Sequence, residues 1–390
     1  MRVLWLASYP IWPPTHGGKI RVYNLVRRLA ESGHQVEVWS ISDEGTPPST
    51  PDLPGITLRH MDARPRNSIV EKSASALSAL PAPAWRLRSA EVLAALKTAG
   101  SFDVIVVGQA VCGALAPEIA GSRWVFDAHN VEWWLTLQIS RRLRNPVTRS
   151  RFALDALKFK GLEKRLLRSA TAIVAVSQVD ADRLHTLVPM AQIDIRPNGV
   201  DLDYFYFVDH SVPHGANLVM TGTLGYYPNL DAGLWLIREI LPRLRERLPG
   251  ATLTLVGGEV TPELQALEGS GVHIAGQVPD VRPFVGAADV FVIPIRLGSG
   301  TRLKALEALA SGLPIVATRL AVEGLGLIER DLVLVGETPD ELAAAIERAI
   351  QDRALRARLV AEGRRYAAEC FGWDRIAADF QATLERAAHA

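Results

Sequence analysis

The chain has 390 residues, 48% of them hydrophobic, and a formal net charge of +1. One hydrophobic core rarely organises a chain of this length, so we expect two domains. Its two cysteines, Cys112 and Cys370, lie far apart without metal spacing, which argues against a disulfide scaffold and favours a reducing cytoplasm. No apolar run is long enough for a signal peptide or a membrane span, which predicts a soluble or peripheral protein. Residues 1–200 carry a net charge of +8 and the remainder −7, so we expect the first half to face something anionic.

Short apolar segments alternate with helical patterns along the whole chain. A helical stripe with apolar residues at 22, 25, 26 and 29 follows the first strand and ends at Gly33. Strands are expected at 2–6, 36–39, 104–107, 124–126, 172–176, 217–220, 252–256, 272–275, 290–293, 315–317 and 332–335. This order predicts an α/β protein of two Rossmann-like domains whose parallel sheets face each other across a cleft. Residues 44–54, rich in Pro, Ser and Thr, are expected to form a surface loop.

We place the first domain at 1–198 and the second at 199–372, joined near 197–213. Ligands of such sheets bind beyond the carboxyl ends of the strands. The loops that follow the expected strands are therefore where functional residues should be found.

The first of these loops is SYPIWPPTHGGKIR at 8–21. Gly17 and Gly18 begin a helix there, where backbone N–H groups can approach a phosphate or a sugar. The order differs from G-x-G-x-x-G, which disfavours a nicotinamide or flavin dinucleotide. Trp12 is a candidate for stacking on an acceptor substrate, such as a sugar or an apolar group. A chain with nine tryptophans also contains core ones, however.

A second polar cluster, FDAHNVEWW at 126–134, follows another strand. We expect His129 to contact the reacting sugar, because three other polar side chains lie beside it at the same strand end. Asn130, Trp133 and Trp134 are assigned to the acceptor, since indole rings stack on sugars and apolar groups.

The most basic segment is 140–170, with ten basic and two acidic residues. Its apolar residues recur at roughly helical spacing. One interpretation is a helix that lies on an anionic membrane or grips a phosphorylated acceptor. The other is an ordinary solvated helix that packs on a sheet.

The second series of strands contributes three glycine-containing loops. After the strand at 217–220, Gly222 and Thr223 form a tight turn, and a helix is expected from 228 with Asn229 as its N-cap. The loops VGGE at 256–259 and GQVPDV at 276–281 could line a base pocket, through Gly257 and Val278.

The most informative stretch is VFVIPIRLGSGTRLKALEALASGLPIVAT at 290–318. A buried strand leads into a loop with Gly298 and Gly300, and a helix opens with Thr301, Arg302 and Lys304. Cations in a first turn oppose the helix dipole unless an anion compensates them. The pattern predicts a site for a phosphorylated ligand, and a nucleotide sugar fits it best.

At this point the chain resembles the retaining GT-B glycosyltransferases of family four over nearly its whole length. The resemblance rests on six motifs: the Gly-Gly loop, the His129-Asn130 pair, VSQVDADRL from 176, RPNGVDLDYF at 196–205, the helix that contains Glu307, and WDRIAADFQATLERA near the terminus. It implies a hinge at PNGVD, and a last helix at 373–390 that packs back on the first domain. Asp201 and Asp203 form an apparent D-x-D, which we interpret as structural because it lies in the linker.

The resemblance also implies site roles. Glu307 would bind the ribose hydroxyls, His129 the transferred sugar, and Ser299, Gly300 and Leu303 the donor. Family members transfer a sugar with retention and without a metal, so no cofactor is expected, and the nucleotide sugar is a co-substrate.

This chain departs from the family pattern in two places. Ser299 replaces an earlier glutamate, and Thr223 and Asn229 stand near the positions of the usual arginine and lysine clamp. The motif G-x-G-T-R-L-K resembles a variant branch in which Arg302 and Lys304 could supply the clamping cations.

We therefore predict an enzyme of the hexosyltransferase type, which moves a sugar from a nucleoside diphosphate sugar to a saccharide, lipid-linked or small-molecule hydroxyl. Gly17, Gly18, Thr301, Arg302 and Lys304 would stabilise the leaving diphosphate. A GT-B epimerase or phosphorylase, and a non-catalytic nucleotide-sugar-binding protein, stay open as alternatives. No nucleic-acid partner is expected.

Overall fold

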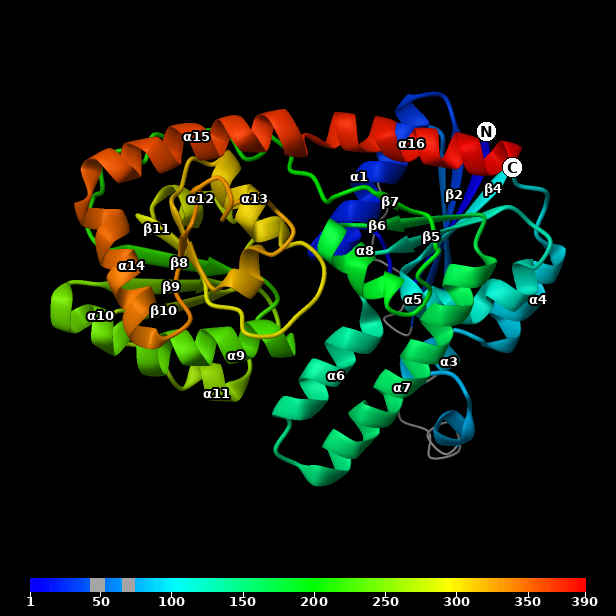
Figure 1. Cartoon of the computed structure of the whole chain (residues 1–390), viewed down its shortest axis with the longest axis horizontal. Helices are drawn as coiled ribbons and strands as arrows, with labels where there is room; N and C mark the ends of the chain where they lie inside the picture. Colours follow the sequence, from blue (N-terminus) through cyan, green and yellow to red (C-terminus); the bar gives the residue numbers. More distant parts are fainter. Residues whose placement is uncertain (43–52, 65–73) are drawn as a thin grey trace. The chain divides into compact units, whose positions relative to one another are not determined.

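The computed structural model describes residues 1–42, 53–64 and 74–390, and most of the loop expected at 44–54 lies outside these residues. The chain forms two compact units (Figure 1). Unit 1 comprises Met1–Pro197 and Asp374–Ala390, and unit 2 comprises Asn198–Trp373.

Unit 1 is built on a parallel sheet of seven strands in the order β3-β2-β1-β4-β5-β6-β7. The strands are β1 (Arg2–Ala7), β2 (Gln35–Ser42), β3 (Ile56–Asp62), β4 (Val104–Gly108), β5 (Trp124–Ala128), β6 (Ala172–Ala175) and β7 (Ile193–Ile195). Their connections contain α1 (Gly17–Glu31), α3 (Ala82–Arg86), α4 (Ala90–Thr98), α5 (Gln109–Cys112), η1 (Gly113–Ile119), α6 (Glu132–Arg142), α7 (Pro146–Ser169) and α8 (Gln178–His185). The last helix of the chain, α16 (Trp373–His389), also lies on this unit.

Unit 2 repeats the design with six parallel strands in the order β10-β9-β8-β11-β12-β13. These are β8 (Asn217–Thr221), β9 (Thr252–Val256), β10 (Val272–Gly276), β11 (Val290–Ile293), β12 (Ile315–Ala317) and β13 (Leu334–Val335). The helices are α9 (Tyr227–Trp235), the π-helix η2 (Leu236–Ile240), α10 (Leu241–Arg247), α11 (Pro262–Gln265), α12 (Arg282–Gly286), α13 (Leu303–Ala310), η3 (Arg319–Val322), α14 (Pro339–Gln351) and α15 (Arg353–Phe371). Both units thus have the predicted Rossmann-like α/β fold.

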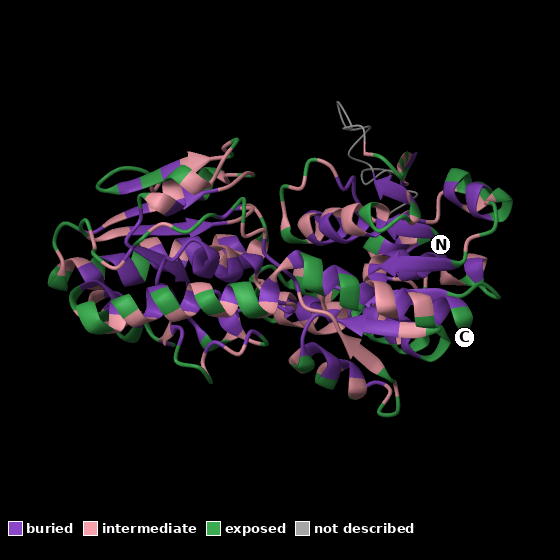
Figure 2. Ribbon diagram, turned by 90° about the horizontal axis from the view of Figure 1, so that it is seen from above, coloured by how far each residue is buried: buried purple, intermediate pink, exposed green. Residues whose placement is uncertain are grey.

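Each unit has its own hydrophobic core, formed by the strands and by the inner faces of the helices (Figure 2). The central strands are buried along nearly their whole length: β4 and β11 contain no exposed residue. Strands covered on both faces read as continuous apolar runs, and this is why their positions could be predicted from the sequence.

Two strands at the sheet edges were not predicted. In β3 exposed residues alternate with half-buried ones and with the buried Met61, and all three residues of β7 are half-buried. An edge strand does not need a continuous apolar run, so these segments lack the pattern that marks the central strands.

Two helix starts differ from the sequence-based expectation. The helix expected from Pro228 begins at Tyr227 with Tyr226 as its N-cap, so Asn229 lies inside the first turn and is not the cap. The helix expected to open with Thr301, Arg302 and Lys304 begins at Leu303, with Arg302 at the N-cap position. Thr301 therefore belongs to the preceding loop.

None of the helices in the described parts of the chain has the length and apolar character needed to cross a bilayer.

Candidate active site

The carboxyl ends of the central strands in unit 2 carry most of the predicted donor residues. The loops after β8, β9 and β10 are joined by backbone hydrogen bonds from Gly222 N to Val256 O (2.9 Å), Leu224 N to Gly258 O (2.8 Å) and Gly257 N to Gly276 O (2.8 Å). These bonds join the three loops into one continuous rim at the carboxyl ends of the strands, where ligands of such sheets bind.

Gly222 and Gly257 are required by this close approach. Both have positive φ, at 134° and 152°, which favours glycine. A Cβ on Gly257 would overlap the carbonyl oxygen of Gly222, and one on Gly222 would meet the Lys304 ammonium at 2.6 Å. Residue 222 therefore lies directly beside a cation.

The loop after β11 is held from within unit 2. Thr301 is 7% exposed, and its hydroxyl accepts a hydrogen bond from Nδ2 of Asn198 at 3.0 Å. Ser299 is buried as well, at 3% exposure. The asparagine of the PNGVD motif thus fixes the shape of the predicted donor loop, a contact that its position in the linker did not reveal.

Arg302 folds back onto this loop. Its Nη1 donates to the carbonyl oxygens of Ser299 and Gly300. A Cβ on Gly298 would overlap the Arg302 guanidinium, so glycine is needed where the arginine crosses the loop. Arg302 therefore closes the loop as well as bringing charge to it.

Lys304 reaches from α13 to the β8–α9 connection. Its Nζ donates to Oδ1 of Asn229 at 2.9 Å, and Nδ2 of Asn229 donates to the Thr223 carbonyl at 2.8 Å. Burial and the Arg302 charge lower the pKa of the Lys304 ammonium to about 7. The ammonium of Lys304, with a weakly held proton, therefore lies beside the β8–α9 connection. By the resemblance, this is the loop in which family members carry an arginine and a lysine that are missing here.

Glu307 lies one turn after Lys304 on the same helix and is partly buried. Burial raises the pKa of its carboxyl to about 7, and the Lys304 charge acts in the opposite direction. Paired groups whose pKa values shift toward neutrality are typical of functional sites.

In unit 1, the polar residues after β5 form a buried ionic cluster around Asp127. Nε and Nη2 of Arg21 donate to the two oxygens of Asp127 at 3.1 and 2.7 Å, and Nε2 of His129 lies 2.8 Å from Oδ2. Burial acts to raise the pKa of Asp127, but Arg21 and His129 together lower it well below its usual range. The carboxylate therefore stays ionised, and it fixes the proton of His129 on Nε2.

The other ring nitrogen of His129 faces Tyr9. Its Nδ1 lies 3.4 Å from the phenolic oxygen, and burial raises the pKa of Tyr9 well above its usual value, so this hydroxyl stays protonated and donates. At 3.4 Å the bond is long, which leaves Nδ1 open to exchange for a substrate hydroxyl.

Gly17 and Gly18 begin α1 as predicted, and His16 is the N-cap that accepts from the Lys19 N–H. The ring of His16 packs edge-on against Tyr9 with 4.9 Å between centroids, and burial with Lys19 lowers its pKa to about 4. The Tyr9 hydroxyl fills the space that a side chain at residue 18 would need. Packing against Tyr9 is therefore enough to explain why residue 18 is a glycine.

The predicted acceptor residues lie on the next segment of unit 1. Nδ2 of Asn130 donates to Oε1 of Glu132 at 3.1 Å. Trp133 and Trp134 contact each other edge-on at 5.6 Å and pack against the core, with Lys160 over the first ring and Arg183 over the second. Both rings therefore already serve the packing of this unit.

A buried carboxylate holds this segment in place. Glu163 of α7 is fully buried, and its two oxygens accept from the backbone N–H groups of Glu132 (2.8 Å) and Trp133 (3.1 Å) at the start of α6. Burial, and next the charge of Glu132, raise the pKa of Glu163 to about 8.

The remaining predicted residues have structural neighbours. Trp12 lies 5.4 Å from the ring of Tyr23, and Val278 packs partly buried on the core of unit 2. In the D-x-D segment, Oδ1 of Asp201 accepts from the backbone N–H groups of Asp203 and Tyr204, which agrees with a structural role. Within the described ranges, no three His, Cys, Asp or Glu side chains gather in a way that could hold a metal ion.

The sequence did not single out Tyr9, His16, Arg21, Lys19 or Asn198. The first four follow β1 and flank the Gly-Gly turn, so their position at a carboxyl strand end was the available signal.

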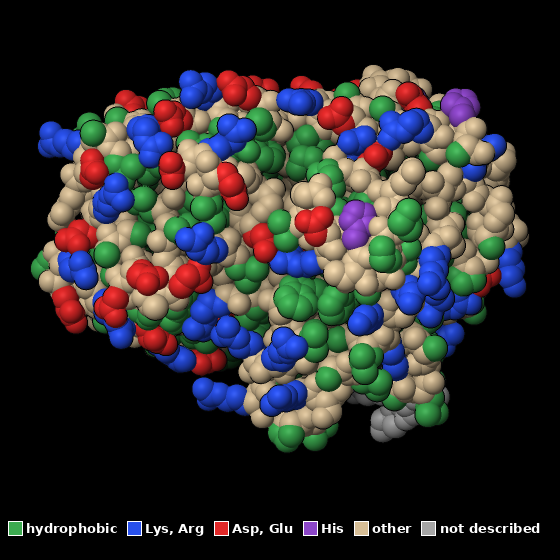
Figure 3. Space-filling model, viewed as in Figure 1, with side chains coloured by type: hydrophobic (Ala, Val, Ile, Leu, Met, Phe, Trp, Pro, Cys, Tyr) green, Lys and Arg blue, Asp and Glu red, His purple; other side chains and the backbone are tan. Residues whose placement is uncertain are grey.

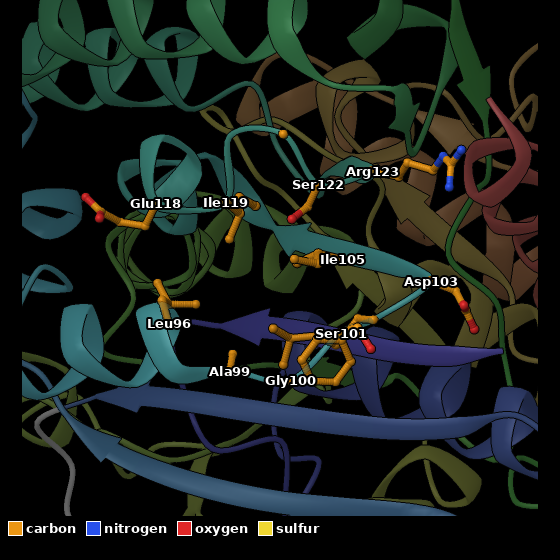
Figure 4. Close-up of a pocket in the computed structure, with 13 residues that line it drawn as sticks. Leu96, Ala99, Gly100, Ser101, Asp103, Ile105, Glu118, Ile119, Ser122 and Arg123 are labelled. Carbon is orange, nitrogen blue, oxygen red and sulfur yellow. The ribbon is translucent and has the colours of Figure 1, made fainter.

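A surface depression of about 520 Å³ lies at the end of the unit 1 sheet where the strands begin (Figure 4). It is lined by Asp103 and Arg123, which directly precede β4 and β5, together with Leu96, Glu118 and Ser122. Because it lies at the amino ends of the strands, it is separate from the polar carboxyl edge of unit 1 described above.

Comparison with known proteins agrees with this geometry. Residues 215–352 match the family model of the group 1 glycosyl transferases, and residues 15–204 match that of Glycosyltransferase Family 4. The MMP α-(1→4)-mannosyltransferase of Mycolicibacterium hassiacum is 30% identical over 411 aligned residues, which cover 96% of each chain. A D-inositol 3-phosphate glycosyltransferase of Streptomyces bingchenggensis is 25% identical over 96% of this chain and 87% of that protein.

Two solved structures share the fold. Sucrose-phosphate synthase from Thermosynechococcus elongatus aligns with a TM-score of 0.77 at 20% identity, over 99% of this chain and 98% of that one. A protein from Anabaena in complex with UDP and glucose aligns with a TM-score of 0.70 at 16% identity, over 99% of both chains. With the 30% identical mannosyltransferase matched over nearly its full length, the chain belongs to the group 1 glycosyl transferases of the GT-B fold and is a glycosyltransferase.

Proposed function

We propose that the enzyme transfers a hexosyl group from a nucleoside diphosphate sugar to a hydroxyl acceptor, with retention of the anomeric configuration and without a metal. The observation that carries this proposal is the position of Lys304, whose ammonium lies beside Gly222 and Asn229 at the rim of unit 2. In this arrangement α13 supplies the cation that the loop after β8 lacks.

Within this proposal the rim of unit 2 binds the nucleotide. Lys304 pairs with the leaving diphosphate and stabilises the charge that develops on it in the transition state. Arg302 holds the Ser299–Gly300 loop in the shape that presents backbone N–H groups, and Glu307 accepts from the ribose hydroxyls. The base of the nucleotide is assigned to the part of this rim formed by Gly222, Thr223, Gly257 and Val278.

The carboxyl edge of unit 1 is assigned to the transferred sugar and the acceptor. Nδ1 of His129 accepts a sugar hydroxyl in place of the Tyr9 hydroxyl, while Asp127 keeps the ring in one orientation. Gly17 and Gly18 offer N–H groups at the start of α1. Asp127 is committed to Arg21 and His129, which supports front-face attack within an ion pair and not a covalent carboxylate intermediate.

Two further observations support the proposal. The name of the mannosyltransferase relative specifies an α linkage, which retention from an α-linked donor produces. Asp201, the first carboxylate of the D-x-D segment, is used by backbone N–H groups, which supports transfer without a metal.

We also propose a cytoplasmic location, peripheral to the inner face of the membrane. Both thiols, of Cys112 and Cys370, are free, as expected in a reducing compartment. The basic segment at 140–170 supports the membrane contact.

The test is incubation with UDP-glucose and with a nucleoside diphosphate mannose, with and without a hydroxyl acceptor and with and without a chelator. We expect acceptor-dependent, chelator-insensitive release of the nucleoside diphosphate, and a product with the anomeric configuration of the donor. An isomerised donor without transfer would instead indicate an epimerase. An inverted product, or loss of activity with the chelator, would contradict retention or metal independence.

A further inference from the structure

Residues 146–169 of the basic segment form the expected helix, α7, and together with α6 they make a helical hairpin. α6 and α7 pack against each other, and the turn between them is residues 143–145 (Figure 1). Asn145 caps α7 by accepting from the backbone N–H groups of Val147 (3.0 Å) and Thr148 (3.1 Å). In Figure 1 the two helices run away from the sheet of unit 1.

The two faces of α7 differ sharply. The inner face packs into the core of unit 1 through Phe159, Leu162, Leu166 and Leu167. Three large apolar side chains point the other way: Val147 is 78% exposed, Leu154 46% and Leu157 68%. Their spacings of seven and three residues put them on one side of the helix, opposite the core.

The exposed charge of this hairpin is entirely positive. None of its three acidic residues is exposed: Glu132 is half-buried at the start of α6, Asp155 accepts from the backbone N–H of Ala82 at 3.1 Å, and Glu163 is fully buried. The exposed cations are Arg141, Arg142, Arg144, Arg149, Arg151, Lys160, Lys164, Arg165 and Arg168. Figure 3 shows Lys and Arg side chains over the hairpin, with hydrophobic atoms at its tip.

A fourth apolar side chain joins this face from a neighbouring segment. The Lys158 ammonium donates to the backbone carbonyls of Ser75 (3.1 Å) and Ala76 (3.0 Å). This holds Leu77, which is 90% exposed, beside α7.

We propose that this outer face of the hairpin, defined by Val147, Leu154, Leu157 and the exposed cations around them, docks on the surface of an anionic lipid bilayer. An apolar stripe rimmed by Lys and Arg, without exposed acidic groups, is the combination that enters the headgroup region of such a surface. This inference rests on the proposed peripheral location and names the surface responsible for it.

Docking here bears on the choice of acceptor. α6 begins at Glu132, three residues after His129, and its eleven residues span about 16 Å. Glu163 and the core contacts of α7 fix the hairpin to the same unit. A docked hairpin therefore holds the unit that carries the acceptor edge against the bilayer, where a hydroxyl on a lipid-anchored headgroup could serve as the acceptor.

The test is co-sedimentation of the full chain with phosphatidylcholine vesicles, alone or containing phosphatidylglycerol. We expect binding only to the anionic vesicles, weakening as salt rises. Replacing Arg165 and Arg168 by Gln should weaken binding about fivefold for each charge. Leu154→Ser with Leu157→Ser should weaken it about tenfold or more, because both side chains enter the headgroup region.

Met190→Ser is the matched control, because Met190 is 89% exposed and lies in the α8–β7 connection. We expect it to bind like the wild type. Equal binding to both kinds of vesicle overturns the proposal. Undiminished binding of the double leucine variant to the anionic vesicles also overturns it. The contact would then depend on charge alone, as a contact with an acidic protein would.

Nucleoside diphosphate affinity and transfer to a water-soluble acceptor separate this proposal from the proposed function. We expect the hairpin variants to keep both. A wild-type protein that binds anionic vesicles but transfers no sugar would contradict the function and leave the docking surface standing.

Discussion

Lys304 is the residue on which the proposed donor site depends most. Its ammonium is partly buried next to Arg302, and its hydrogen bond to Asn229 holds it beside the loop after β8. Burial and the neighbouring guanidinium disfavour its charged form and lower its pKa to about 7. A bound diphosphate reverses this preference, because an anion close to an ammonium favours the proton.

The first prediction follows from this proton. At pH 8 most Lys304 side chains have lost it, so binding of a nucleoside diphosphate should take up a proton, and affinity should fall as the pH rises from about 7 to 9. Lys304→Met should abolish the proton uptake. It should also lower the affinity for the nucleoside diphosphate by about ten- to a hundredfold, the usual effect of losing a hydrogen bond to a charged group. Calorimetry in two buffers of different ionisation enthalpy measures the uptake.

Glu307→Gln is the control for this measurement, because the pKa of Glu307 is also shifted to about 7. We expect this variant to keep proton uptake and to lose affinity for the nucleoside and its diphosphate alike, since its proposed contact is the ribose. Undiminished uptake in Lys304→Met would contradict the assignment.

The second prediction separates the two cations. Arg302 donates to the Ser299 and Gly300 carbonyls, so Arg302→Ala should loosen the whole loop and weaken a bare nucleoside and a nucleoside diphosphate by similar factors. Arg302→Lys should recover only part of the loss, because an ammonium cannot reproduce the planar fork. Paired titrations of both ligands measure this. A loss confined to the diphosphate would instead make Arg302 the clamp.

At this scale the sequence predicted residue types better than contacts. The glycines at 222 and 257, the histidine at 129 and the Lys304 cation were singled out because each follows a strand. Asn198 and Arg21 were not, because their partners Thr301 and Asp127 lie 103 and 106 residues away in the chain. Nothing in local pattern indicates which distant side chain a buried polar group will meet.

At the scale of elements, sequence patterns predicted the central strands and missed the edges. Continuous apolar runs marked β4 and β11, since strands between two helical layers are buried on both faces. The helix expected within 140–170 is α7, but the sequence did not show which of its sides faces the core. Apolar residues with helical spacing occur on both faces of α7, and only packing shows that Leu162 is inside and Leu157 outside.

The third prediction concerns the attachment of α6 to α7 through Glu163. Its pKa is about 8 in the folded protein and about 4.3 when unfolded, so the folded state binds an extra proton between these values. Stability from this group is therefore full below about pH 4.3 and is lost as the pH rises through 8. Gln does not titrate, but it has one acceptor oxygen where the carboxyl group of Glu163 offers two.

Because the Gln amide nitrogen cannot accept the second of the two backbone N–H groups at the start of α6, Glu163→Gln should lose about 1–3 kcal/mol near pH 5, and this loss should shrink toward pH 9, where the wild type no longer has the contribution of the protonated carboxyl. Chemical denaturation at both pH values measures the free energy of unfolding. Glu31→Gln, at a side chain 60% exposed, is the control for a change of net charge. A difference that does not vary with pH would show that Glu163 is not the titrating group.

At the scale of the whole molecule, unit 1 contains both the first strand and the last helix of the chain, which pack against each other. α16 brings Phe380 onto Trp5 of the first strand, with ring centroids 5.5 Å apart. Arg196 Nε donates to the Asp379 carbonyl at 2.9 Å, and Arg28 pairs with Asp374 at 2.7 Å. Unit 1 therefore cannot be complete until the last residues of the chain have folded onto it.

The last prediction tests whether this closure supports the candidate site. Phe380 is fully buried, and the Arg21 guanidinium lies 5.9 Å from its ring while pairing with Asp127, the partner of His129. Phe380→Ala should cost about 3–5 kcal/mol of stability through the cavity it leaves. With Arg21 less well packed, we also expect turnover to fall well below wild type at a temperature where the variant is still folded. Nucleoside diphosphate affinity should not change, because that ligand is assigned to unit 2.

Phe102→Ala is the matched control for that experiment. Phe102 carries the Arg2 guanidinium 5.3 Å from its ring and lies at the amino edge of the same sheet, so its loss should lower stability without lowering turnover. Steady-state rates, calorimetric affinity and melting temperature for the two variants decide the question. If Phe380→Ala keeps full turnover while folded, α16 stabilises unit 1 but does not position His129, and the orientation of that ring depends on Asp127 without help from the end of the chain.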